Sequence, residues 1–129
     1  MKEIIVPTQE RFQLVDITEK AREAVVENNK EKGFLLVFVL HTTAGIIITE
    51  NEEDLKKDWL RILKKIVSGI DFFHNRIDNN ADSHILAGLV GQHKIIPIKD
   101  KDLLLGKWQS LFLAEFDGPR ERKIIIEVF

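Results

Sequence analysis

Cysteine and tyrosine are absent from this 129-residue chain, and proline occurs only three times. Without cysteine the protein has no disulfide framework, no thiolate nucleophile, no iron–sulfur cluster and no Cys-ligated zinc site. A site for a soft metal would therefore have to combine histidine with carboxylates. The four histidines are therefore the first candidates for metal ligands.

A large excess of one charge and long apolar runs are also missing. Nineteen Lys and Arg residues stand against twenty-one Asp and Glu residues, which gives a formal net charge of -2. This balance does not favour binding to nucleic acid or to an anionic membrane surface. The N-terminal residues lack the apolar segment of a signal peptide, and the longest apolar run, Phe34–Leu40, is far too short to span a bilayer. We therefore expect a cytoplasmic enzyme or binding protein.

Residues 1–129 read as a single domain, because no linker, repeat or low-complexity tract interrupts them. Short runs rich in β-branched and aromatic residues predict the strands. These are Glu3–Val6, Phe12–Val15, Phe34–Leu40, Gly45–Thr49, Ile95–Ile98, Trp108–Phe116 and Lys123–Phe129. Every residue of Phe34–Leu40 is apolar, which is typical of a strand covered on both faces.

Three segments carry helical periodicity and are each followed by a glycine. They are Thr18–Lys32, Glu52–Ser68 and the shorter Ala81–Val90. The sequence Asp16-Ile17-Thr18-Glu19 is a capping signature for the first, and Asn51 and Asn80 are the expected N-caps of the other two. The order β-β-α-β-β-α-α-β-β-β does not alternate regularly, so it predicts an α+β fold with a mixed or antiparallel sheet.

The first polar constellation is His41-Thr42-Thr43-Ala44-Gly45, which follows the most apolar predicted strand. Polar groups at the end of a buried strand are held rigidly and are well placed for ligand contact. His41 is able to bind a metal or transfer a proton, and the hydroxyls of Thr42 and Thr43 are able to donate to a phosphate or carboxylate. The alternative interpretation is a turn containing a hydrogen-bonded histidine.

The second constellation runs from His74 to His84 and is the most polar stretch of the chain. It opens a helix, whose free N–H groups attract anions, with Ser83 and His84 in the first turn. Asp82 and His84 are two positions apart and do not share a helical face, so the spacing does not encode a helical pair of ligands. Helix capping accounts for Asn80 and Asp82 without any further function, but it does not account for both histidines.

The third constellation comprises Trp108-Gln109 and Glu115-Phe116-Asp117-Gly118-Pro119-Arg120. Asp-Gly-Pro is a strong turn signal. Glu115 closes an apolar strand and Arg120 follows the turn, which suggests an ion pair or an anion site. An exposed hairpin salt bridge is the alternative. His93 lies between two polar residues beside a strand and is interpreted as a surface residue.

Three of the four histidines thus lie in polar segments that are far apart in sequence. If His41, His74 and His84 converge, they would form a three-histidine set suited to zinc, with an open position for water or substrate. The spacing alone leaves this convergence as a hypothesis.

Five short segments occur in a characteristic order. They are His41-Thr42-Thr43-Ala44-Gly45-Ile46, Glu50-Asn51, Asn80-Ala81-Asp82-Ser83-His84-Ile85, Leu105-Gly106-Lys107-Trp108-Gln109-Ser110 and Glu115-Phe116-Asp117-Gly118-Pro119-Arg120. Together they resemble the YjbQ-type family, also known as the secondary thiamine-phosphate synthase family, over essentially the whole chain. The resemblance implies an α+β fold containing a β-sandwich, assembled as a homotrimer with sites near the subunit boundaries.

The resemblance also implies an activity, in which a hydroxymethylpyrimidine diphosphate is joined to a thiazole phosphate and pyrophosphate is released. It implies a metal or ligand site, with zinc as the first choice of metal, at His41, His74 and His84. The expected catalytic residues are His41, Asp82, His84 and Arg120. The expected substrate-binding residues are Thr42, Thr43, Ser83, Gln109, Glu115, Asp117 and Arg120.

Two other functions stay open at this point. One is metal-assisted hydrolysis of a phosphorylated metabolite by a histidine-bound water. The other is a non-catalytic trimer that binds a small anionic ligand. In each case the expected partner is a small anionic or phosphorylated molecule, and neither nucleic acid nor a membrane is expected.

Overall fold

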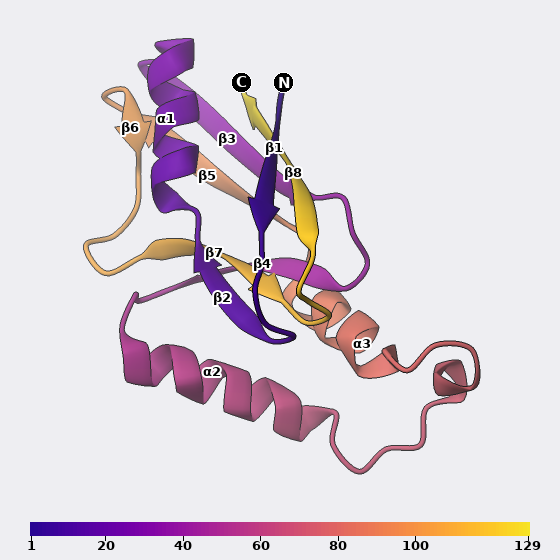
Figure 1. The fold of residues 1–129 in the computed structure, drawn as a ribbon. Helices are drawn as coiled ribbons and strands as arrows, with labels where there is room; N and C mark the ends of the chain where they lie inside the picture. The colour runs from indigo at the N-terminus through magenta and orange to yellow at the C-terminus, as the bar shows by residue number, and fades with distance from the viewer.

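The computed structural model describes all residues from Met1 to Phe129 (Figure 1). The strands are β1 (Lys2–Pro7), β2 (Gln13–Asp16), β3 (Lys32–Val39), β4 (Ala44–Thr49), β5 (His93–Lys99), β6 (Asp102–Leu103), β7 (Ser110–Glu115) and β8 (Glu121–Val128). The helices are α1 (Thr18–Asn28), α2 (Glu53–Ile66) and α3 (Ala81–Val90), and a 3-10 turn, η1, spans Phe73–Arg76. No helix is both long enough and apolar enough to cross a membrane.

The strands form two sheets. The larger has the order β1-β8-β3-β5-β6 and the smaller has the order β2-β7-β4. Every strand pair in both sheets is antiparallel. The α+β fold with antiparallel strands is therefore confirmed, although the short β6 and the turn η1 were not among the expected elements.

Two apolar clusters hold these layers together. The larger lies between the two sheets and α1, and it includes Val37 of β3, Ile46 of β4 and Val25 of α1. The smaller lies beneath α2 and α3 and includes Leu63 and Phe116. Helices α2 and α3 thus cover the smaller sheet on the side away from the main core. The cavity described below opens where α3 meets the ends of strands from both sheets.

Strand β3 is covered on one face only, so the expectation of cover on both faces is wrong for the single chain. Leu35 and Val37 are fully buried, whereas Phe34 and Phe38 are 48% and 37% exposed. The reason is that α1 and the smaller sheet pack on the same side of the larger sheet. The opposite side, here called the outer sheet face, carries exposed apolar residues. They are Ile5, Phe34, Phe38, Leu40, Ile95 and Phe129.

Most element boundaries differ from the predicted ones by a few residues, and three differences at helix or strand ends are described here. Helix α1 stops before Lys32 because Asn29 adopts a left-handed backbone with φ of 50°. Helix α2 is capped by Glu52, whose carboxylate accepts the N–H groups of residues 54 and 55, and not by Asn51. Strand β7 begins after Trp108, whose side chain is 65% exposed in a turn.

Candidate functional site

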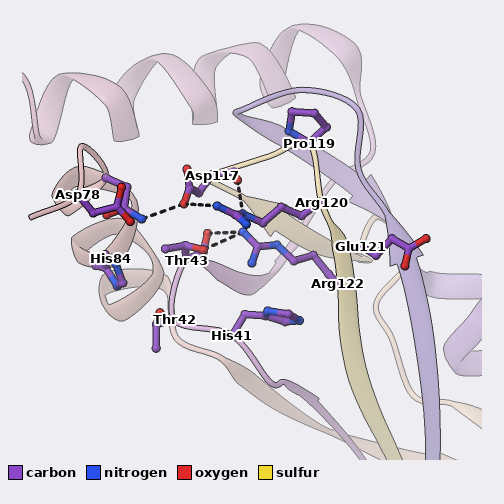
Figure 2. A pocket seen from close by; sticks show the side chains of 11 residues that line it. His41, Thr42, Thr43, Asp78, His84, Asp117, Pro119, Arg120, Glu121 and Arg122 are labelled. Atoms are coloured by element: carbon purple, nitrogen blue, oxygen red, sulfur yellow. Dashed lines mark hydrogen bonds and ion pairs between the residues drawn. The ribbon is translucent and has the colours of Figure 1, made fainter.

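A cavity of about 670 Å³ lies where the β3–β4 connection, α3 and the β7–β8 connection meet (Figure 2). Apart from Pro119, all of its lining side chains are polar or charged. They are His41, Thr42, Thr43, Asp78, Asn80, His84, Asp117, Pro119, Arg120, Glu121 and Arg122. Ligand pockets are usually lined mainly by apolar groups, so this lining favours a small, charged and well-hydrated ligand.

The β7–β8 connection depends on a close backbone approach at Gly118. A Cβ atom at this position would lie 2.3 Å from the carbonyl oxygen of Glu10 and 2.8 Å from Oγ1 of Thr8. The backbone N–H of Gly118 donates to the carbonyl of Arg11. A residue without a side chain is therefore required to bring Asp117 and Arg120 against the segment after β1.

Arg122 and Glu115 form a buried ion pair at the base of the cavity. Their side chains are 2% and 0% exposed. Nε of Arg122 donates to Oε2 of Glu115 at 2.8 Å, and Nη2 donates to Oε1 of Glu115 and to Oγ1 of Thr43 at 2.8 Å. Thr8 donates its hydroxyl to Oε2 of Glu115 at 2.7 Å, and the N–H of Asp117 donates to Oε1 at 2.9 Å. Neither charge is left without partners.

The pKa of Glu115 reflects this environment. Burial raises the pKa, but the hydrogen bonds from Arg122, from the Asp117 N–H and from Thr8 lower it by more. The pKa therefore lies below its ordinary value of 4.5, and the carboxyl stays ionised beside the guanidinium.

Arg120 belongs to a second and more exposed chain of contacts. Its Nε donates to the backbone carbonyl of Asp117 at 2.8 Å, and its Nη2 donates to Oδ2 of Asp117 at 3.2 Å. Nδ2 of Asn80 donates to the same Oδ2 at 3.0 Å, and Oδ1 of Asn80 lies 3.0 Å from Nε2 of His74. Because an amide oxygen only accepts, Nε2 of His74 is the donor in that contact.

The Asn80 side chain therefore does not cap α3, and the capping interpretation is wrong for this residue. Oδ1 of Asn75, in η1, accepts the N–H of Ala81 instead. Asp82 does accept the N–H of Ser83 within the first turn, and it also pairs with Arg11 at 2.9 Å. The predicted pairing at the hairpin also differs, because Glu115 pairs with Arg122 and not with Arg120.

His41 is fixed by the backbone of β8. The N–H of Lys123 donates to Nε2 of His41 at 2.8 Å, so Nε2 acts as the acceptor and Nδ1 carries the proton. Burial lowers the pKa of His41, and the positive charge of Arg122 lowers it further against the opposing effect of Glu115. His41 is therefore a neutral hydrogen-bond donor at physiological pH.

The histidines do not assemble a metal-binding group in this arrangement. The rings of His74 and His84 lie edge to face with centroids 4.9 Å apart. Nε2 of His41 and Nε2 of His74 are already engaged with Lys123 and Asn80. No group of three or more His, Cys, Asp or Glu side chains is arranged to hold a metal ion. The three histidines are not placed to hold one metal ion together in this arrangement, so the zinc site stays a prediction and no chemical step below depends on a metal.

The structure gathers part of the predicted site. The predicted residues that line the cavity are His41, Thr42, Thr43, His84, Asp117 and Arg120. Ser83 is fully buried and donates its hydroxyl to the carbonyl of Phe116 at 2.6 Å. Gln109 lies outside the cavity, where its Oε1 accepts the N–H of Gly106. Among the predicted residues outside the lining are also His74, Asp82 and Glu115. His93 is exposed, as expected.

Four polar lining residues were missed as site residues: Asp78, Asn80, Glu121 and Arg122. Arg122 is the most informative because a sequence signal for it exists. In β8, Arg122, Ile124 and Ile126 alternate on the inward face and are all buried. A charged residue in phase with buried isoleucines must be paired or functional. The predicted strand began at Lys123 and so left this residue out.

The chain is similar to proteins that span the same length. The family model described as "UPF0047 protein YjbQ-like" matches residues 2–129. A UPF0047 protein of Archaeoglobus fulgidus is 36% identical, with 97% of this chain and 98% of that protein covered. The UPF0047 protein YugU of Bacillus subtilis is 32% identical, with 99% and 98% covered.

Solved structures show the same fold. A YbjQ-like protein of unknown function from Sulfolobus solfataricus superposes with a TM-score of 0.96 at 38% identity, covering 98% of this chain and 94% of that one. An uncharacterised protein of the YjbQ/UPF0047 family from Clostridium acetobutylicum superposes with a TM-score of 0.95 at 37% identity, covering all of both chains.

Proposed function

The chain belongs to the YjbQ family, and on that basis we propose that it is a phosphate-handling enzyme of the thiamine-phosphate synthase type. One observation carries the proposal. A single polar cavity gathers two arginines, two threonines and two histidines from three separate parts of the chain. Guanidinium groups and hydroxyls are the donors that phosphate oxygens prefer. We also propose that the protein is cytoplasmic, as the sequence predicts.

The proposed reaction needs mainly positioning and charge stabilisation. The C–O bond between the pyrimidine methylene carbon and the diphosphate breaks, and both electrons leave with the oxygen. The lone pair of the thiazole nitrogen forms the new C–N bond, which gives a thiazolium and free pyrophosphate. That nitrogen carries no proton to lose, so the protein has to align the two substrates and stabilise the departing charge.

Arg120 is suited to hold phosphate because its own side chain is exposed and has one partner residue, Asp117. Its side chain is 53% exposed and its contacts are all with Asp117. Exposed ion pairs of this kind contribute little to stability, so a phosphate can replace the Asp117 carboxylate at little cost. Thr42 lies at the cavity wall as a further donor.

The two lining histidines have different roles in this proposal. His84 lies in the first turn of α3, where its imidazole is able to donate a proton to the leaving diphosphate oxygen. His41 is neutral and serves as a hydrogen-bond donor through Nδ1. The three-histidine zinc site would require His41 and His74 to leave their present partners, so it is carried as a separate prediction that metal analysis of the purified protein tests.

We also propose that the protein assembles as a homotrimer through the outer sheet face. The six exposed apolar residues of that face form the kind of surface that marks an association site. A second copy of the chain is the proposed occupant, and the number three comes from the family resemblance. Light scattering on the purified protein should give three times the mass of one chain, and Phe38→Asp should yield a smaller species.

The activity is tested by incubating purified protein with both substrates and measuring thiamine phosphate by chromatography. We expect turnover by the wild type and a loss of roughly 100-fold in His84→Ala and in Arg120→Ala. Arg61→Ala is the matched control, because that side chain is 80% exposed on α2. Turnover unchanged by His41→Ala or Arg120→Ala would refute the site assignment. A ligand-dependent thermal shift without any turnover would favour the non-catalytic alternative.

A further inference from the structure

One nitrogen of the most deeply buried arginine is left without a protein partner. Arg122 is 1% exposed. Its Nε and Nη2 bind Glu115 and Thr43, whereas Nη1 makes no hydrogen bond. Every fully buried side-chain nitrogen and oxygen of the molecule has a hydrogen-bond partner. Nη1 is therefore not completely buried, and because Arg122 lines the cavity, we infer that the small area exposed at this nitrogen faces into it.

The rest of the guanidinium is held in place. A planar group with two of its three nitrogens bound to a buried carboxylate and to Thr43 has no freedom to rotate. Burying this pair has a large desolvation cost that its own attraction seldom exceeds. An arginine required only for packing would not need to direct one donor into an otherwise polar cavity.

Two further donors lie beside the Arg122 guanidinium. The hydroxyl of Thr43 accepts from Nη2, so its own hydrogen remains available. Nδ1 of His41 carries a proton, and the charge of Arg122 acts on this ring more strongly than any other charge. Figure 2 shows Thr43 and His41 next to the Arg122 guanidinium, with Arg120 nearby. The carboxylate of Asp117 is occupied by Arg120 and Asn80.

We propose that Nη1 of Arg122, the Thr43 hydroxyl and Nδ1–H of His41 form a preorganised anion subsite that binds one phosphate group, while Arg120 binds a second. The ligand class is thus a diphosphate, or two phosphorylated molecules side by side, rather than a single monophosphate. The inference rests on the proposed function for the role of the cavity, but its test needs no turnover.

The test is calorimetric titration with inorganic phosphate and with pyrophosphate at pH 7.5 and low salt. The main variant is Glu115→Leu/Arg122→Met, which replaces both buried charges together and so avoids leaving one unpaired. We expect pyrophosphate affinity to fall roughly 10- to 100-fold, as for the loss of a charged hydrogen bond. The binding of inorganic phosphate should be weaker in this double variant and should be unchanged in Arg120→Ala. Arg61→Ala is the control for a general loss of positive charge.

A folded double variant that binds pyrophosphate as tightly as the wild type would overturn the inference. Should that variant fail to fold, the wild type supplies a second measurement. With ¹⁵N-labelled arginine, the guanidinium resonance protected from exchange should shift on addition of phosphate. A shift confined to exposed arginines would contradict the subsite.

The outcomes separate this inference from the proposed function. Loss of pyrophosphate affinity in the double variant, in a protein that forms no thiamine phosphate, would support the subsite and refute the synthase activity. Wild-type turnover by the double variant would refute the subsite and leave the synthase activity in place.

Discussion

Two arginines near the start of β8, Arg120 and Arg122, each pair with a carboxylate near the end of β7. The two pairs differ mainly in their exposure to water. The side chains of Arg122 and Glu115 are 2% and 0% exposed, whereas those of Arg120 and Asp117 are 53% and 17% exposed. The buried pair has a full set of partners on its carboxylate, including Thr8. The exposed pair is held by only a few contacts around Asp117.

This difference in exposure shows how the start of β8 provides one fixed guanidinium, that of Arg122, and one movable guanidinium, that of Arg120. Breaking a buried pair leaves an uncompensated charge and is strongly destabilising. An exposed pair contributes little and is easily exchanged for another partner. Arg122 is therefore able to act as a rigid anchor, and Arg120 is able to leave Asp117 for an incoming phosphate. The predictions below test this contrast.

The largest effect is expected for Arg122→Met. The substitution leaves the buried Glu115 carboxyl without its charge partner, so the free energy of unfolding should fall by about 3–5 kcal/mol. Denaturant unfolding followed by circular dichroism measures it. The Glu115→Leu/Arg122→Met double variant should recover most of the loss. A single variant within about 1 kcal/mol of the wild type would show that the pair is not effectively buried.

A somewhat smaller loss of unfolding free energy is expected for Gly118→Ala, which disturbs the loop that precedes Arg120 and Arg122. The new Cβ would meet the Glu10 carbonyl at 2.3 Å, and backbone must move to relieve the clash. We expect a loss of about 1–3 kcal/mol in unfolding free energy. Gly88→Ala is the matched control, since nothing lies within 4 Å of its Cβ position on α3. Equal stability of the two variants would argue against the close approach at Gly118.

The buried pair should also make stability depend on pH. The pKa of Glu115 is lowered in the folded protein, so the unfolded chain binds the proton more readily. The contribution is fully present above pH 4.5 and is lost as the pH falls through the lowered pKa. It amounts to about 1.4 kcal/mol for each unit by which the pKa is lowered. Urea unfolding between pH 6 and about pH 3 should show this slope in the wild type and in Asp117→Asn. Persistence of the same slope in the Glu115→Leu/Arg122→Met variant would assign it to other groups.

The smallest effect on stability is expected for Arg120→Ala. Its side chain is half exposed, so the unfolding free energy should change by no more than about 1 kcal/mol. Its pyrophosphate affinity should nevertheless fall, because one of the two phosphate contacts is lost. Thermal unfolding with and without pyrophosphate measures both quantities. A large loss of stability here would remove the contrast between the two arginines.

Much of the fold could be predicted because it follows from local pattern. The periodicity of the three helical segments and the β-branched runs gave the element types, and the order of elements gave the α+β class. The outer sheet face could not be foreseen from Phe34–Leu40, because an apolar run does not tell which face another layer will cover. An assembly of several copies would cover such a face in the same way as a buried core.

The site could be predicted only in part. Polar residues at the end of β3 and at the start of α3 indicated His41, Thr42, Thr43 and His84. The pairing of Glu115 with Arg122 is decided by the alternation of β8, which points Arg122 inward, while Arg120 lies before the strand. The engagement of Asn80 by His74 and Asp117 depends on η1, which caps α3 with another residue.

The most direct test of the account is a crystal structure of the protein with pyrophosphate at a concentration close to its measured Kd. We predict one phosphate group within hydrogen-bonding distance of Nη1 of Arg122 and of the Thr43 hydroxyl, with Arg120 turned from Asp117 toward the second phosphate. Pyrophosphate bound only through Arg120, or bound outside this cavity while Arg122 Nη1 faces water, would contradict the account.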